Sequence, residues 1–190
     1  MELLNVILGA IGIILLTVWM IYNKFIKIGN MCQESWSGIE TELKRRYDLI
    51  PNLVETVRGY AKYEQSVLEN VTRMRTLAVG STGSPQSQAK DENALVGSLK
   101  SLFAVAEKYP DLKADQNFLK LQEELVNTED RIQAARRFYN GNVRDFNNHV
   151  QMFPSNMFAS LWNFQVKEYF EIEATVERAK PDVSFEANQK

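Results

Sequence analysis

The chain has 190 residues, of which 45% are hydrophobic and 24% are charged, and its formal net charge is −2. This length allows one modest domain plus an appendage, and the charge argues against a general nucleic-acid-binding role. The single cysteine, Cys32, excludes a disulfide framework within the chain and a cysteine-rich zinc site, and it fits a reducing compartment.

The first predicted element is an uncharged apolar segment at the N-terminus, LLNVILGAIGIILLTVWMIY, residues 3–22. At about 1.5 Å per residue, a helix of this length spans roughly 30 Å, the thickness of the hydrocarbon core of a bilayer. Aromatic residues and cations at its end are typical of a membrane interface. We therefore predict a transmembrane anchor over residues 1–23. Its marker residues are Leu3, Trp19, Tyr22, Lys24 and Lys27.

A cleaved signal peptide is the alternative interpretation of this segment. Such a peptide has positive charge before a shorter apolar run and small residues at a cleavage site. Here Glu2 is the only charged side chain before the run, and bulky residues follow it. The cations lie after the anchor, so the positive-inside rule places the following domain in the cytoplasm and a very short N-terminus outside.

The soluble part begins with a helical pattern that we place over residues 30–79. Gly29 is a weak point between this helix and the anchor. Residues 80–92 are rich in Gly, Ser, Pro and Gln, and we predict a flexible connection there. The helical pattern rests on apolar residues at steps of three and four: Ile39, Leu43, Tyr47, Ile50, Val54, Val57, Ala61, Leu68, Val71 and Ala78.

A shorter helix over about residues 93–109 should end before Pro110, because the residue before a proline is pushed out of helical geometry. The clearest pattern follows over about residues 114–151. Its unbroken steps of three and four indicate a long helix that packs along another long helix. The residues of this stripe are Phe118, Leu121, Leu125, Thr128, Ile132, Ala135, Tyr139, Asn142 and Phe146.

Pro154 ends that helix, and a short helix over about residues 155–165 follows it. The tail, residues 171–190, has mixed charge and is expected to be loosely held. No strand-like alternation of useful length is present. We therefore predict an all-α protein, in which the anchor precedes an antiparallel bundle of two long and two short helices, residues 24–170.

Pro51 lies inside the first long helix, where a proline costs about 3 kcal/mol. The apolar stripe keeps its phase across it, so we predict a kinked helix rather than a break. The bend is either a shape adjustment or a hinge or interface groove. Lys44, Arg45 and Arg46 come just before it. They form a solvated face or pair with acidic residues of a neighbouring helix, or else they contact another subunit or anionic lipid.

The last predicted helix, MFASLWNF, is apolar on nearly all sides and carries Phe158, Trp162 and Phe164. A short helix of this kind must be covered by its own domain, by a second subunit or by the membrane interface. These three aromatic residues are therefore interface candidates.

Residue patterns for chemistry are sparse, and we predict no catalytic, cofactor-binding or metal-ligating residue. A di-metal bundle needs Glu-x-x-His on two helices, whereas Phe146 lies three residues before the sole histidine, His149. The acidic residues of the second long helix are interspersed with arginines, which favours a salt-bridged solvent face. They are Glu123, Glu124, Glu129 and Asp130.

Three stretches resemble the LemA family: ELKRRYDLIPNLVETVRGYA, AEKYPDLKADQNFLKLQEELVNTEDRIQAARRFYNGNVRDFN and FPSNMFASLWNF. The resemblance covers about residues 27–170 plus the single anchor, and it departs locally at FQVKEYFEIE, where relatives often carry a proline. It implies a single-pass protein of a bacterial inner (plasma) membrane with a cytosolic helical domain. The family has no established enzymatic activity, so no catalytic residue carries over. Some relatives are linked to membrane shaping in organelle-forming bacteria, and others are encoded beside membrane proteases.

Two functions fit these features. The first is a non-enzymatic membrane scaffold that self-associates through its helical domain, whose partners are further copies of itself and membrane lipid. The second is an adaptor that presents a helical surface to another membrane protein, such as a membrane protease. They differ in whether the apolar surface contacts itself or a different protein.

Overall fold

The computed structural model describes residues 1–171, and every regular element in that range is a helix. The helices are α1 (Glu2–Tyr60), α2 (Gln65–Gly80), α3 (Pro85–Ala106), α4 (Pro110–Lys113), α5 (Gln116–Gln151) and α6 (Ser155–Leu161). The predicted all-α class is therefore confirmed, and so is the bundle that follows an apolar N-terminal helix. The predicted tail lies outside the described residues except for Glu171.

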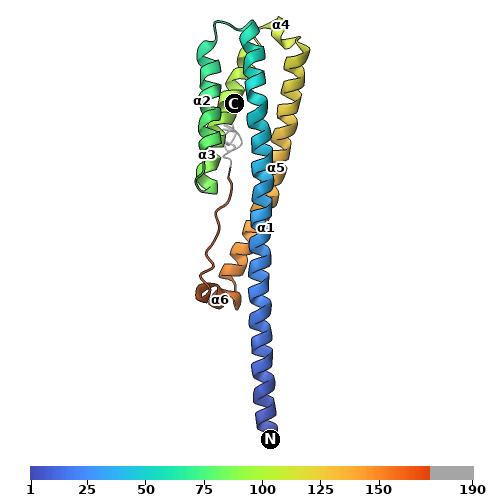
Figure 1. Ribbon diagram of the computed structural model, residues 1–190, viewed down its shortest axis with the longest axis vertical. Coiled ribbons are helices and arrows are strands. Elements are labelled where there is room, and N and C mark those ends of the chain that lie inside the picture. The colour runs from blue at the N-terminus through green and yellow to red at the C-terminus, as the bar shows by residue number, and fades with distance from the viewer. Residues whose placement is uncertain (172–190) are drawn as a thin grey trace, which may run out of the picture.

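Helix α1 is the axis of the molecule. It has 59 residues, and its N-terminal part extends alone beyond the bundle (Figure 1). The rest of α1 packs against α5 on one side and against the α2–α3 hairpin on the other. Gly29 does not interrupt the helix, which continues on both sides of it. A Cβ at this position would make an ordinary contact with Phe146 at 3.7 Å.

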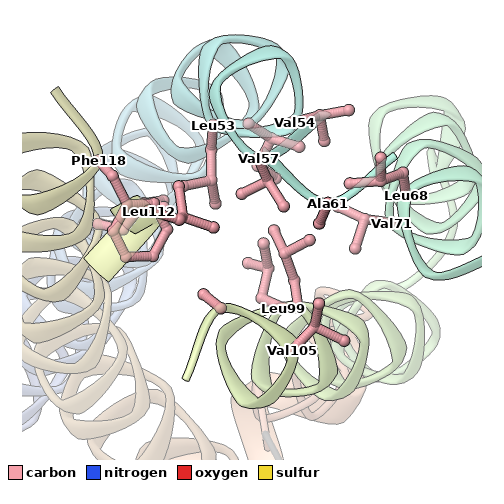
Figure 2. Packing of buried hydrophobic residues seen from close by; sticks show 14 of the residues in the cluster. Leu53, Val54, Val57, Ala61, Leu68, Val71, Leu99, Val105, Leu112 and Phe118 are labelled. Atoms are coloured by element: carbon pink, nitrogen blue, oxygen red, sulfur yellow. The ribbon is translucent and has the colours of Figure 1, made fainter. Parts of the chain in front are cut away.

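The first soluble helix is shorter than predicted. The chain leaves α1 at Ala61, and α2 starts at Gln65, so the expected helix over 30–79 is two antiparallel helices joined by a tight turn. Leu68 and Val71, which continue the apolar stripe in the sequence, reach the core from α2 instead (Figure 2).

The predicted loop over 80–92 is also wrong, because α3 begins at Pro85. The Ser84 side chain accepts a hydrogen bond from the backbone N–H of Ser87, and Pro85 occupies the first turn, where its missing N–H costs nothing. Only residues 81–84 connect α2 to α3, and α3 ends at Ala106 rather than near residue 109. The last helix is likewise shorter than predicted, since α6 ends at Leu161 and the chain then becomes extended.

Helix α5 follows the prediction to within two residues. Asp115 caps it by accepting a hydrogen bond from the Phe118 N–H at 2.9 Å. The predicted stripe faces the core, and within it Thr128 and Asn142 are buried. Asn142 donates hydrogen bonds to the backbone carbonyl of Met31 and to the Ser35 hydroxyl, both at 3.2 Å, which ties α5 to α1.

Two apolar clusters form the core. The first lies at the end of the bundle away from the N-terminus, where side chains from all the surrounding helices converge (Figure 2). Ile50 and Val54 join this cluster from either side of Pro51, and α1 remains helical throughout. The phase of the stripe is therefore preserved as expected, while the bend at Pro51 stays a prediction. The second cluster includes Phe25 and Phe170, and it lies nearer the N-terminal extension.

Candidate functional site

A buried polar layer crosses the bundle with Arg46 of α1 at its centre. The Arg46 side chain is 1% exposed, and it forms ion pairs with Glu92 of α3 and with Glu129 of α5, the latter 2.7 Å from Nη1 to Oε2. The Tyr47 hydroxyl donates a hydrogen bond to the other carboxylate oxygen of Glu92. Arg75 of α2 donates from Nε to the Tyr47 carbonyl at 2.6 Å. The polar layer therefore joins four helices.

The polar layer separates the two apolar clusters. On each of three helices, the charged residue lies between a member of one cluster and a member of the other. These triplets are Leu43–Arg46–Ile50 on α1, Ala89–Glu92–Leu95 on α3 and Leu125–Glu129–Ile132 on α5. A single set of ion pairs thus links the three helices at the level between the two apolar clusters.

The chemistry of the polar layer is structural. Burial raises the pKa of the Tyr47 hydroxyl, and its hydrogen bond to Glu92 raises it further, so the phenol stays protonated and donates. A buried ion pair such as Arg46–Glu92 contributes little net stability, because desolvation offsets much of the attraction.

These positions decide between the alternatives for Arg46 and refine the expectation for Glu129. Arg46 pairs with acidic residues of neighbouring helices, which is one of the alternatives that the sequence left open, and it is no interface residue because its own domain encloses it. Glu129 is partly exposed, at 32% of its side chain, and it forms an ion pair that reaches inward to Arg46. Lys44 and Arg45 do lie on the surface, and so does Pro51. Sequence reasoning missed Glu92 altogether, because it was assigned to a flexible loop.

Aromatic rings gather where α1 leaves the bundle. Phe25 is fully buried and stacks on Phe164 with ring centroids 4.6 Å apart. Tyr22 meets Trp162 edge-to-face at 5.0 Å, and Phe158 stacks on Trp162 at 5.4 Å. Each such contact adds about 0.5–1.5 kcal/mol beyond area burial. We call these five residues the aromatic junction. It brings the three predicted aromatic candidates together with the end of the predicted anchor.

An extended stretch after α6 returns along α5 and is held by two asparagines. Asn147 donates to the Lys167 carbonyl at 2.9 Å and accepts from the Lys167 N–H at 2.7 Å. Asn140 makes the same pair of bonds with Phe170, at 3.1 and 2.9 Å. The seven-residue spacing of the asparagines, two helical turns, is the sequence signal for this clamp.

An open groove of about 470 Å³ lies between α1, the start of α3 and the extended stretch. Its lining includes Cys32, Trp36, Tyr139 and Glu168. Burial raises the pKa of the Cys32 thiol, so the thiolate needed of a nucleophile is disfavoured. Burial likewise raises the pKa of Tyr139 to about 12, and its hydroxyl donates to the Glu168 carbonyl at 3.0 Å. The groove therefore offers binding surface rather than an activated nucleophile.

The sequence model of the LemA family matches residues 35–185, which is most of the chain. The chain belongs to the LemA family. Protein LemA of Metamycoplasma hominis is 30% identical over 158 residues, covering 80% of this chain and 70% of that protein.

Magnetosome proteins are also similar to this LemA-family protein. Magnetosome protein MamQ 2 of Paramagnetospirillum magneticum is 28% identical over 180 residues, and magnetosome protein MamQ of Magnetospirillum gryphiswaldense is 26% identical over 179 residues. The matches cover 82% and 81% of this chain, and 66% of each relative. The chain thus spans just under two thirds of the length of these magnetosome proteins.

Two of the predicted anchor residues, Leu3 and Trp19, lie on the part of α1 that extends beyond the bundle, whereas Tyr22 packs in the aromatic junction. Leu3 and Trp19 are 76% and 63% exposed, and Lys24 and Lys27 are exposed beyond them. Over the described residues, α1 is the one helix long and apolar enough to cross a membrane. Together with its relatives, this helix marks the LemA-family chain as a membrane-associated protein.

His149 lies beside the aromatic junction rather than in a reactive site. Its ring centroid is 4.9 Å from that of Phe25. Burial lowers the pKa of the imidazole, and the positive charge of Lys24 lowers it further. Within residues 1–171, no group of three or more His, Cys, Asp or Glu side chains is placed to hold a metal ion.

Proposed function

We propose that this LemA-family protein is a non-enzymatic membrane scaffold. Its N-terminal segment spans a bacterial inner membrane, and its helical domain self-associates on the cytoplasmic face. The observation that carries the proposal is α1 itself. One unbroken helix supplies an exposed apolar segment over residues 3–22 and then the central element of the bundle core.

The same helix supports an anchor that is retained rather than cleaved. A signal peptide is separated from the mature chain at a small-residue site in an accessible segment. Here Tyr22 and Phe25 are part of a helix that continues without a break, and both pack in the aromatic junction. Cleavage after the apolar segment would cut a folded element.

The bundle also offers surface for lateral contacts. Leu119, Val126 and Phe138 of α5 are 46%, 56% and 61% exposed. Single contacts through such residues are weak, but anchored copies share a membrane plane, and linked weak contacts gain strength through high effective concentration. The magnetosome relatives support a role in membrane organisation. The protonated thiol and phenol of the groove suit binding better than catalysis.

Light scattering on the full-length chain in mild detergent tests self-association. We expect particles of several chains, whose mass falls on dilution. A variant with Leu119→Lys, Val126→Lys and Phe138→Lys should give smaller particles with unchanged helical circular dichroism. Particles of one chain at every concentration would contradict the scaffold. Crosslinking in cells only to a different membrane protein would instead favour an adaptor.

The orientation rests on Lys24 and Lys27, which follow the apolar segment. A cysteine at Lys108 reports on it, because this exposed residue lies between α3 and α4, and α4 is at the end of the bundle away from the N-terminus (Figure 1). In a Cys32→Ala background, Lys108→Cys should resist a membrane-impermeant thiol reagent in intact cells and react after lysis. Labelling in intact cells would place the domain outside.

A further inference from the structure

Four large apolar side chains are left uncovered at the end of the bundle from which the N-terminal segment emerges. Met152, Phe153, Met157 and Leu161 are 62%, 78%, 64% and 75% exposed. The last three recur every four residues, and α6 carries Met157 and Leu161. We call these four residues the α6 apolar face.

The opposite side of α6 is packed. Ser155 and Ala159 are 4% and 1% exposed, and α6 contacts α5 and α1. Residues two positions apart on a helix point in nearly opposite directions, so Met157 and Leu161 point away from the bundle. Met157 and Leu161 therefore form the outer surface of the helix at this end of the bundle (Figure 1), and Met152 and Phe153 are exposed just before it.

The position of this face along α1 is fixed by the aromatic junction. Trp162 directly follows α6, and its ring lies 5.0 Å from the ring of Tyr22. Tyr22 ends the apolar segment, and a helix over residues 3–22 spans roughly 30 Å, the hydrocarbon thickness. If that segment crosses the bilayer, Tyr22 and Trp162 lie together at the lipid–water boundary.

We infer that the α6 apolar face inserts into the interfacial region of the same membrane, in the leaflet on the side of the bundle. This inference rests on the proposed transmembrane anchor. The anchor holds the face against lipid, so lipid rather than a second copy of the chain is the occupant. Lys24 and Lys27 are exposed at the same level, where cations meet lipid headgroups.

The consequence is attachment at two points. The anchor crosses the bilayer, and α6 contacts its surface beside the exit of α1. Because the aromatic junction connects the two, the bundle is held at a fixed tilt rather than swinging on a single helix. Short apolar surfaces with aromatic and cationic neighbours bind the interface in this way.

Depth-dependent fluorescence quenching tests the inference on the full-length chain in vesicles of phosphatidylcholine and phosphatidylglycerol. In a Cys32→Ala background, an environment-sensitive dye is attached to Met157→Cys, to Leu16→Cys in the anchor, or to Lys108→Cys at the far end. Lipids carry a nitroxide either near the headgroup or deep in the chain. Helical circular dichroism confirms that each labelled protein is folded.

We expect the dye at residue 157 to show blue-shifted emission. The nitroxide near the headgroup should quench most of its fluorescence intensity. The dye at residue 16 should respond to the deep nitroxide, and the dye at residue 108 to neither. Adding Leu161→Glu should reduce quenching at residue 157 and leave residue 16 unchanged.

Two results would overturn the inference while the anchor stands. One is water-like emission at residue 157 with quenching at residue 16. The other is blue-shifted emission at residue 157 that no lipid nitroxide quenches, which would mean that a protein covers the face. Absence of quenching at residue 16 would instead remove the transmembrane anchor, and the inference with it.

Discussion

Replacing Arg46 with methionine removes the guanidinium from the centre of the polar layer and keeps an unbranched but shorter side chain. Glu92, whose side chain is 2% exposed, would lose its ion pair and keep the Tyr47 hydroxyl as a donor. Glu129 is better placed, because its side chain is 32% exposed and can turn to water. The main cost is therefore the buried carboxylate left without its cation.

Removing one partner of a buried ion pair costs about 3–5 kcal/mol. A typical domain has a free energy of unfolding of about 5–15 kcal/mol, so Arg46→Met should remove a large share of the stability. In a domain of this size each kcal/mol lowers Tm by about 2–4 °C. The expected fall in Tm is therefore roughly 6–20 °C.

Thermal unfolding of the full-length chain in detergent, followed by circular dichroism, measures this effect. Arg45→Met is the matched control, because Arg45 is the exposed neighbour and its loss should change stability by about 0.5 kcal/mol or less. The double variant Arg46→Met with Glu92→Met should recover most of the loss, since an apolar pair can replace a buried ion pair. Equal Tm values for Arg45→Met and Arg46→Met, or no recovery in the double variant, would refute this account.

Three further substitutions probe other parts of the fold. Asn147→Ala removes both hydrogen bonds to Lys167 and should cost about 1–3 kcal/mol, with faster proteolysis of the extended stretch; unchanged cleavage would contradict the clamp. Pro51→Ala restores a helix N–H at an exposed position and should raise the free energy of unfolding, measured by denaturant titration, by up to about 3 kcal/mol. A lower free energy of unfolding would show that the fold requires the proline. The folded-state pKa of His149 is lowered, so the stability linked to its neutral form is complete above the unfolded pKa of about 6.5. That stability is lost as the pH falls toward the folded-state pKa. Below about pH 6.5, the Tm of His149→Gln should therefore depend less on pH than the Tm of the unchanged protein.

Periodicity predicted the elements that span many turns. Helix α5 keeps apolar or small residues at alternating steps of three and four, and its observed bounds differ from the expected ones by two residues or fewer. The N-terminal helix was equally clear, because few structures other than a long apolar helix fit twenty consecutive uncharged residues. A pattern that repeats over many turns identifies a helix even where single residues depart from it.

The wrong helix boundaries occur where turn and capping residues, rather than overall composition, determine the structure. The turn after Ala61 contains neither glycine nor proline, and the apolar stripe continues in phase on α2, so periodicity alone does not mark the reversal. Ser84 and Pro85 were interpreted as loop residues, although a serine followed by a proline is also a helix start. That error placed Glu92 in a loop and hid the polar layer.

For the candidate sites, the sequence identified some of the residues but not their contacts. Phe158, Trp162 and Phe164 were recognised as surfaces in need of cover, and the structure covers each of them partly through the aromatic junction. Which ring meets which could not be predicted, because Tyr22 and Trp162 are far apart in the sequence. The inward direction of Arg46 was equally hidden, since its neighbours Lys44 and Arg45 face solvent.

The polar layer and the aromatic junction together constrain what a scaffold of this design can build. The polar layer links three helices through ion pairs, and the junction packs against α1 where it leaves the bundle. No flexible linker separates the apolar segment from the core, because α1 is helical from Glu2 to Tyr60. If the apolar segment crosses the bilayer as proposed, rotation of the bundle about the membrane normal must therefore rotate that segment with it. In the proposed scaffold, neighbouring copies would meet in a narrow range of orientations, which favours ordered lateral contacts over random clustering.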